Sequence, residues 1–143
     1  MSYMSGKTFM DTNVLIDAHD SDAGVKREIA RDRLRDLWAG RSGVLSTQVL
    51  HEFYVNATRK IATPLSKPAA RAIVDSYAIW CFNTTYAETA AAFRIEDEAG
   101  IDFWDALIVA AAQKAGATRI LSEDLNAGQT IAGVRIENPF VGH

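Results

Sequence analysis

The chain has few of the features that mark secreted or membrane proteins. Its 143 residues include a single cysteine, Cys81, which cannot form a disulfide within the chain and fits a reducing compartment. No apolar run approaches the ~18 residues of a membrane-spanning helix, and the N-terminal residues lack the apolar stretch of a signal peptide. We therefore expect a cytoplasmic protein that does not associate with membranes.

The composition also lacks the marks of disorder. Hydrophobic residues make up 48% of the chain and charged residues 23%, which is ordinary for a globular protein. A chain of this length can bury a core of its own. We expect one domain over residues 1–143, since no internal repeat, linker or low-complexity segment divides it.

Basic charge is scarce in the second half of the chain. Residues 1–83 carry 11 basic and 9 acidic side chains, whereas residues 84–143 carry 4 basic and 9 acidic ones. The net charge of −3 therefore combines a weakly basic half with an acidic half. Because local fields decide binding, this total does not exclude a nucleic-acid partner.

The first acid of the chain has no basic residue near it in the sequence. Asp11 directly follows two apolar residues and soon precedes three more at 14–16, yet no Lys or Arg occurs between Lys7 and Lys26. A lone carboxylate at the edge of a core is costly unless a cation or hydrogen bonds meet it. A distant part of the chain, or a bound ion, must supply that partner.

Short apolar segments alternate with amphipathic ones along the chain. The expected strands are 8–10, 43–46, 79–82, 118–121 and 134–136. The expected helices are 14–19, 25–39, 47–61, 69–80, 85–99 and one within 101–112 that is apolar nearly all round. The alternation predicts an α/β fold with a mainly parallel sheet of four or five strands and helices on both faces.

The ends and inner faces of these helices can also be assigned. The candidate N-caps are Thr12 or Asn13, Ser21 or Asp22, Ser46 or Thr47, and Asp102. The expected core positions are Ile29, Ala30, Leu34, Leu37 and Trp38 in the second helix and Val49, Leu50, Phe53 and Ala57 in the third.

Four carboxylates are placed to converge at one edge of this sheet. Asp11 and Asp124 each follow a strand, at the edge where open α/β sheets bind ligands. Asp105 falls in a helical first turn, and Glu52 little more than one turn into a helix that starts at the same edge. Two unit charges ~4 Å apart repel by about 4 kcal/mol at an effective dielectric near 20, so such a cluster needs cations. Oxygen ligands without a His or Cys cluster suit Mg²⁺ or Mn²⁺.

Each acid also has a structural explanation. Asp105 could complement the helix dipole and Asp102 could act only as a cap. Glu52 could be a surface residue and Asp124 a turn residue, whereas Asp11 is the hardest to explain structurally. Asp17 and Glu123 are expected to be peripheral.

Basic and acidic residues form neighbouring rows on the second helix. Arg27, Arg31 and Arg35 are spaced four apart, and the acids at 28, 32 and 36 form the row beside them. The rows could be a solvated face with side-chain ion pairs. Alternatively, these arginines could hold an RNA backbone outside the acidic pocket, together with Arg59, Lys60 and Arg71.

Together these segments resemble a known family. The motifs DTNVL (11–15), TQVLHEFY (47–54), FWDALIVAAA (103–112) and LSEDL (121–125) occur in the order and spacing of PIN domains, down to the closing NPF at 138–140. The resemblance is closest to the VapC-type toxins of bacterial toxin–antitoxin pairs. It implies a PIN-like three-layer fold and a Mg²⁺- or Mn²⁺-dependent endoribonuclease.

The resemblance also assigns roles to residues. The catalytic and metal-binding acids of the family fall on Asp11, Glu52, Asp105 and Asp124. Its small polar residue beside the first acid falls on Thr12 or Asn13, and the hydroxyl before the third helix on Ser46 or Thr47. We expect Thr12, Asn13, Ser46 and Asn56 to hold the carboxylates in place.

The expected reaction is phosphodiester hydrolysis by metal-activated water, leaving 5′-phosphate and 3′-hydroxyl ends. The resemblance further implies an RNA substrate, a VapB-like antitoxin whose tail covers the acidic crevice, and a homodimer. One alternative is a haloacid-dehalogenase-like phosphatase, although that family needs a second Asp where Asn13 stands. The other is a non-catalytic PIN scaffold that binds RNA or protein, although such a scaffold should lack an acid.

Overall fold

The sheet carries the fold. The computed structural model describes residues 6–141. In that part of the chain, six strands form one sheet in the order β3-β2-β1-β4-β6-β5. The strands are β1 (Lys7–Met10), β2 (Gly43–Ser46), β3 (Cys81–Phe82), β4 (Ala117–Leu121), β5 (Thr130–Ile131) and β6 (Val134–Glu137). Neighbouring strands run parallel except β5 and β6, which pair antiparallel.

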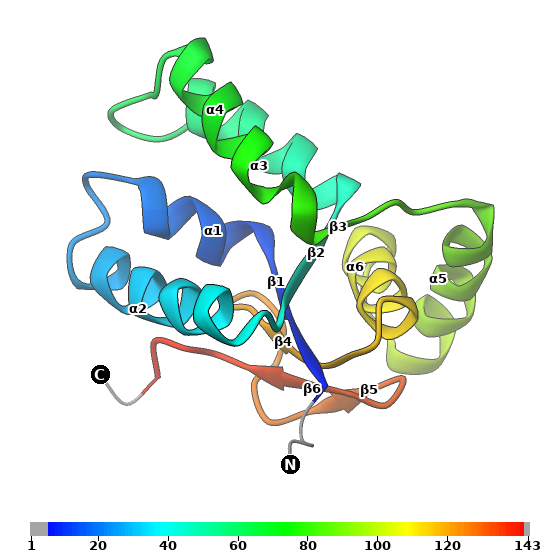
Figure 1. The fold of residues 1–143 in the computed structure, drawn as a ribbon. Helices are drawn as coiled ribbons and strands as arrows, with labels where there is room; N and C mark the ends of the chain where they lie inside the picture. Colours follow the sequence, from blue (N-terminus) through cyan, green and yellow to red (C-terminus); the bar gives the residue numbers. More distant parts are fainter. Residues whose placement is uncertain (1–5, 142–143) are drawn as a thin grey trace.

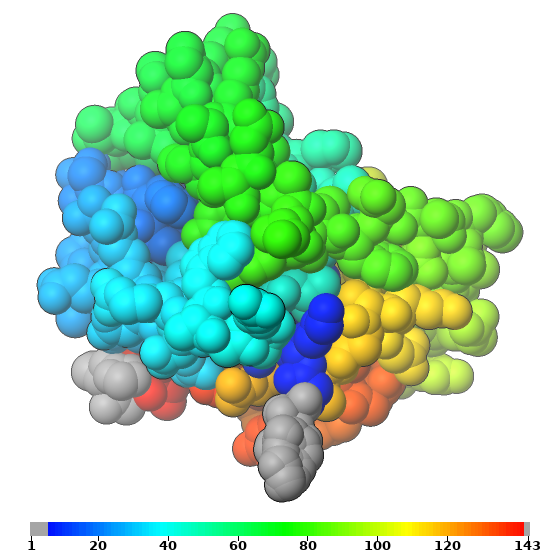
Figure 2. Space-filling model, in the orientation of Figure 1, coloured from blue at the N-terminus to red at the C-terminus, as the bar shows by residue number. Residues whose placement is uncertain are grey.

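Helices cover both faces of the sheet. They are α1 (Thr12–His19), α2 (Val25–Gly40), α3 (Thr47–Arg59), α4 (Lys67–Tyr77), α5 (Tyr86–Ala99) and α6 (Phe103–Lys114), with a 3-10 turn at Ala78–Trp80. Helices α1 and α2 lie on one side of the sheet and α5 and α6 on the other (Figure 1). Helices α3 and α4 pack together and form a lobe that projects from the rest of the molecule (Figure 2). Within residues 6–141, no helix combines the length and the apolar character needed to span a membrane.

These layers confirm the predicted α/β class, the mainly parallel sheet and the helices on both faces. The sheet has six strands where four or five were expected. The strand missing from the prediction is β5, whose two residues are too few to show a hydrophobic period.

The strand order places the chain's first acid beside the end of a distant strand. Strand β1 lies between β2 and β4, and Met10 at its end is in register with Leu121 at the end of β4. The backbone N–H of Asp11 donates to the carbonyl of Leu121 at 3.0 Å. The residues that follow β1 and β4 therefore leave the sheet together, at the point where the strand order reverses.

The core confirms most of the predicted inner faces. Helix α6 is buried continuously from Ala106 to Ala112, which agrees with its apolar sequence and its central place. In α3, all four predicted core residues are buried, and so are Ala30, Leu34 and Leu37 of α2. Trp38 is wrong as a core prediction, because 40% of it is exposed and it packs on Trp80 with ring centroids 4.5 Å apart. Ile29 is only half-buried.

Several predicted helix ends are wrong. Helix α1 is capped by Asp11, whose side chain accepts from the Thr12 N–H. Helix α2 starts after Gly24, which has a φ of 63°, and Asp22 instead accepts a hydrogen bond from Thr63. Helix α3 ends at Arg59 rather than at 61. The predicted helix 69–80 stops as an α-helix at Tyr77, because the chain tightens into the 3-10 turn before β3.

Candidate active site

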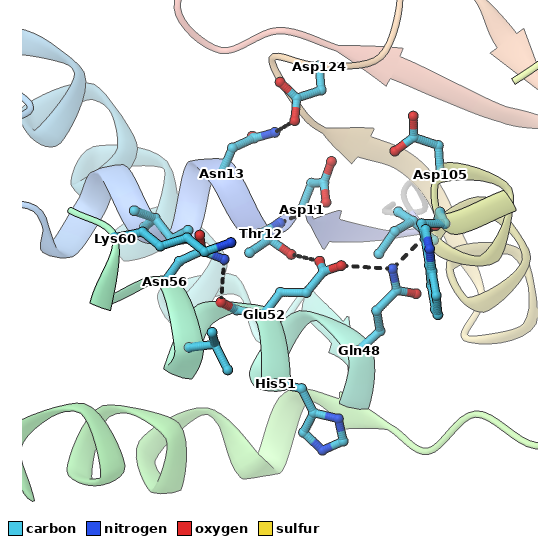
Figure 3. Close-up of a pocket in the computed structure, with 14 residues that line it drawn as sticks. Asp11, Thr12, Asn13, Gln48, His51, Glu52, Asn56, Lys60, Asp105 and Asp124 are labelled. Carbon is cyan, nitrogen blue, oxygen red and sulfur yellow. Dashed lines mark hydrogen bonds between the residues drawn. The ribbon is translucent and has the colours of Figure 1, made fainter. Parts of the chain in front are cut away.

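Four acids from separate segments of the chain line one open cavity. The cavity has a volume of about 590 Å³, and Asp11, Glu52, Asp105 and Asp124 all contribute to its wall (Figure 3). They come from the end of β1, from α3, from the first turn of α6 and from the loop after β4. The structure thus brings together the four carboxylates that the sequence singled out.

Asp11 is buried and is held by neutral hydrogen-bond donors. It is 6% exposed. Its Oδ1 accepts from the backbone N–H of Thr12 and its Oδ2 from the hydroxyl of Ser122, both at 2.7 Å. In the described part of the chain no Lys or Arg forms a salt bridge with it. Burial raises the pKa of Asp11 to about 6, and the charges of Asp105 and Asp124 add to the rise against the lowering by the two hydrogen bonds.

The carboxylate of Glu52 is held by side chains from two helices, α1 and α3. The hydroxyl of Thr12 donates to its Oε1 at 2.6 Å, and the amide of Gln48 donates to its Oε2 at 3.2 Å. Asn56 lines the cavity one turn further along α3, but its amide donates to the backbone carbonyl of Glu52 at 2.7 Å. Thr12 therefore holds the carboxylate itself, whereas Asn56 contacts only its backbone.

Asn13 joins helix α1 to the loop after β4. Its Nδ2 donates to Oδ2 of Asp124 at 2.7 Å, and its Oδ1 accepts from the backbone N–H of Glu123 at 3.3 Å. The Ser122 hydroxyl oxygen also accepts from the backbone N–H of Asp124 at 3.2 Å. Although Asp124 is exposed, its side chain is held by Asn13 of α1 and its backbone by Ser122 of its own loop.

Asp105 faces other acids from the first turn of α6. Asp102 caps that helix, and its Oδ1 accepts from the backbone N–H of Asp105 at 3.0 Å. Burial raises the pKa of Asp105 to about 6, and the charges of Asp102 and Asp124 raise it further. Asp102 is not part of the cavity wall and acts as the predicted cap.

The two hydroxyl residues predicted before α3, Ser46 and Thr47, do not line the cavity. Ser46 is fully buried, and its hydroxyl has no hydrogen-bond partner within residues 6–141. It occupies the N-cap position of α3 without capping it. Thr47, the other candidate, pairs its hydroxyl with that of Thr84 at 3.2 Å. Neither hydroxyl reaches the four acids.

Arg31 of α2 contacts the end of α1 that is farther from Asp11, roughly 12 Å along an eight-residue helix. Arg31 donates from Nε to the carbonyl of Ala18 at 2.8 Å, and Arg35 pairs with Asp32 at 2.7 Å. His19 has its pKa lowered to about 4, first by burial and then by the charges of Arg31 and Arg27. None of the three arginines lines the cavity.

Asp17 and Glu123 form a separate acidic pair beside the site. Burial raises the pKa of Asp17 to about 7, and a hydrogen bond with Glu123 raises it further. Glu123 pairs with Lys26 at 2.7 Å. Neither acid lines the cavity, which agrees with the prediction that both are peripheral.

Some residues of the wall were not singled out from the sequence. They include Gln48, His51 and Trp104, and Ser122 lies just behind the wall. Ser122 directly follows β4, as Asp11 follows β1, and Gln48 precedes Glu52 by one helical turn, so position alone could have identified both. The ring of His51 points away from the carboxylates (Figure 3).

The donor set fits a divalent cation in its chemistry. No three His, Cys, Asp or Glu side chains in residues 6–141 are arranged as a ready-made metal site. Nevertheless, Asp11 is buried without a protein cation, and the pKa values of Asp11 and Asp105 are raised first by burial and then by the charges of neighbouring acids. A cation would relieve both effects, and four carboxylates with neighbouring amide and hydroxyl oxygens are ligands for a hard ion.

Comparisons with known proteins identify the fold and the family. The family model of the PIN domain matches residues 8–130. A toxin–antitoxin complex from Klebsiella pneumoniae contains a chain with 19% identity and a TM-score of 0.71, covering 94% of this chain and 98% of that one. No curated protein matches the chain significantly.

Two further solved structures share the fold. One is VapC20 of Mycobacterium tuberculosis, described as a sarcin–ricin loop cleaving toxin, with 16% identity, a TM-score of 0.60 and coverage of 80% of this chain and 87% of that one. The other is FitAB bound to a DNA fragment, with 16% identity, a TM-score of 0.66 and coverage of 92% and 94%. At these identities the likeness establishes a common fold.

Proposed function

The chain belongs to the PIN domain family, and from this membership we propose that it is a metal-dependent endoribonuclease acting as the toxin of a toxin–antitoxin pair in the cytoplasm. The observation that carries the proposal is the convergence of four carboxylates on one open cavity, with the most buried of them, Asp11, lacking a protein cation. Such an acidic site is suited to a phosphodiester substrate only when cations neutralise it.

In this proposal Asp11, Glu52, Asp105 and Asp124 hold one or two Mg²⁺ or Mn²⁺ ions. A divalent cation there lowers the pKa of water that it binds and neutralises charge that develops on the phosphate. The protein fixes the carboxylates: Ser122 holds Asp11, Thr12 holds Glu52 and Asn13 holds Asp124. The raised pKa values of Asp11 and Asp105 mean that both carboxyl groups must release protons before they act as ligands.

The toxin role is supported by the solved structures that share nearly the whole fold. Two of them are described as a toxin–antitoxin complex and as a sarcin–ricin loop cleaving toxin. We expect the partner to be a VapB-like antitoxin that covers the open cavity, and we expect a homodimer. Family membership leaves the haloacid-dehalogenase alternative without support, and Asn13, where that family needs an acid, instead donates to Asp124.

The test is RNA cleavage by the purified protein with Mg²⁺ or Mn²⁺. We expect cleavage to stop with a chelator and in Asp11→Asn, and to persist in the control Arg35→Gln, which changes a residue outside the cavity. The new ends should be 5′-phosphate and 3′-hydroxyl, and a 2′,3′-cyclic phosphate would overturn the mechanism. RNA binding without cleavage would favour the non-catalytic scaffold, and turnover of p-nitrophenyl phosphate would favour a phosphatase.

The RNA target can be found in cells. Brief induction of the wild type should create new 5′ ends in specific RNAs, and induction of Asp11→Asn should not. If both proteins generate the same ends, the four carboxylates are not the catalytic site.

A further inference from the structure

One face of α3 forms the floor of the acidic cavity. Gln48, Glu52, Asn56 and Lys60 follow one another at intervals of four residues and all line the cavity. Figure 3 shows them in this order along its lower side. Twelve residues of helix span roughly 18 Å, so the cavity is elongated along α3, with Glu52 in its interior. An elongated cavity of this kind has two different ends.

The end near Gln48 is formed by an exposed aromatic side chain. Trp104 is 61% exposed, although it lies directly before Asp105 and lines the cavity. It also lines an adjoining hollow of about 390 Å³, which Gln48, His51 and Glu52 share. A large aromatic side chain left mostly in solvent forgoes the ~1.5–3 kcal/mol that burial would bring, so its exposure calls for an explanation.

The position of Trp104 is fixed although its ring is open to solvent. Its backbone carbonyl accepts from Nε2 of Gln48 at 3.3 Å, and the same nitrogen donates to Glu52. Its ring meets the edge of Phe103 at a centroid distance of 5.2 Å and an angle of 71°. Trp104 is therefore held at a set position relative to two of the four acids, which suits a stacking platform.

The opposite end of the cavity is basic. Lys60 caps the C-terminus of α3 and is the one Lys or Arg among the described residues that line the cavity. It is exposed, and it makes no salt bridge within residues 6–141. An unengaged ammonium group beside a cluster of carboxylates is available to an anionic ligand.

We propose that the cavity is a track for single-stranded RNA, in which the indole of Trp104 stacks on one base and the ammonium of Lys60 holds a backbone phosphate at the other end. This inference rests on the proposed ribonuclease function. It adds the two residues that determine the position of the RNA strand along the cavity. Stacking tolerates every base and needs a base that is not already stacked in a duplex, so the track selects single strands. The two contacts together place one phosphate over the acids between them.

The test is the binding of a short single-stranded RNA to the Asp11→Asn protein with Mg²⁺ present, measured by fluorescence anisotropy. Trp104→Ala should weaken binding about 5-fold or more, and Trp104→Phe should retain most of it. The matched control is Tyr86→Ala, which removes an aromatic side chain that is 77% exposed and lies outside the cavity. Thermal melting of each variant checks that the fold is intact.

A scan of abasic positions along the same RNA separates stacking from a general loss of binding. One abasic position should weaken binding to the parent as much as Trp104→Ala does, and should have no further effect in that variant. Equal affinity of Trp104→Ala and its parent for the intact RNA would overturn the proposal. So would a change in oligomeric state by light scattering with RNA affinity unchanged, because the indole would then belong to a protein interface.

Lys60→Gln should weaken binding to every RNA sequence alike and should reduce the slope of log affinity against log salt by about 0.7. Lys67→Gln, which changes an exposed lysine outside the cavity, is the control and should alter neither. An unchanged slope for Lys60→Gln overturns the phosphate contact. If the wild type neither binds nor cleaves RNA, the proposed function fails instead, so the two failures are distinguishable.

Discussion

The carboxyl group of Asp11 is buried, and its charged neighbours are other acids. Its pKa is raised from 3.8 to about 6, first by burial and then by Asp105 and Asp124. Below about pH 6 the protonated form of Asp11 therefore predominates in the folded protein. The stability that this shift contributes is fully present below about pH 4 and is lost as the pH rises through about 6.

This shift makes a prediction for the protein in chelator. At pH 7.5, Asp11→Asn should be more stable than the wild type by about 1–3 kcal/mol, because the amide carries no charge to bury. The difference should shrink as the pH falls toward 4. Urea unfolding of both proteins at several pH values measures it, and a wild type that gains stability relative to the variant as the pH rises from 4 to 6 would contradict the assignment.

The residues of the site differ in how far the sequence reveals them. Asp11, Asp124 and Asp105 could be predicted, because Asp11 directly follows β1, Asp124 lies in the loop after β4 and Asp105 lies in the first turn of α6. The supporting bonds could not be assigned so well. Asn56 was expected to hold a carboxylate, but its amide donates to a backbone carbonyl, and the buried hydroxyl of Ser46 has no hydrogen-bond partner within residues 6–141. Side-chain hydrogen bonds depend on rotamers and on partners up to 111 positions away, which no local pattern encodes.

At the scale of elements, α2 shows how a regular charge pattern can mislead. The spacing of its arginines allowed either a solvated face or an RNA contact. In the fold, Arg31 reaches the last turn of α1 and donates to the carbonyl of Ala18, where a cation also complements the helix dipole. Arg35 forms an exposed pair with Asp32. This geometry favours a structural role for Arg31.

We therefore predict that Arg31→Gln lowers the free energy of unfolding by about 1 kcal/mol, because a bond to a helix-terminal carbonyl is lost. RNA affinity and its salt dependence should stay unchanged. Urea unfolding and anisotropy measure the two effects, with Arg35→Gln as the control that changes stability little. A weaker, less salt-dependent affinity in Arg31→Gln would show instead that RNA extends beyond the cavity onto α2.

Helix ends were harder to predict than helices, for physical reasons that differ from case to case. The capping box of Thr85 and Glu88 is a local pattern, and α5 begins where the sequence indicated. The cap of α1 could not be assigned from such a pattern, because Asp11 directly follows β1, caps α1 and also lines the cavity. Trp38 was assigned to the core because its period fits, but its packing partner Trp80 lies in a turn 42 positions later.

At the scale of the whole molecule, the parallel sheet explains why acids so far apart in sequence meet. Parallel strands place their carboxyl ends at one edge, and the reversal of strand order beside β1 opens a gap there. The layers could be predicted because alternating strands and helices have few ways to cover a sheet. The strand order, and with it the contact between Asp11 and Ser122, could not be predicted from the sequence, because both depend on how the elements pack.

A site that holds uncompensated charge should couple cation binding to the stability of the whole fold. An ion that binds the folded chain and not the unfolded one stabilises it by RT ln(1 + [L]/Kd), which is about 2.7 kcal/mol at 100 times Kd. For a chain of 143 residues this corresponds to a rise in Tm of roughly 5–10 °C. We predict such a rise when Mn²⁺ or Mg²⁺ is added to the chelator-treated wild type at pH 7.5.

The rise in Tm should be smaller at pH 5, where protons occupy Asp11 and Asp105 and compete with the ion. Asp11→Asn should lose most of it, whereas Arg35→Gln should keep it. Calorimetry on the three proteins measures these shifts, and an equal rise in the wild type and Asp11→Asn would place the ion elsewhere than among the four carboxylates.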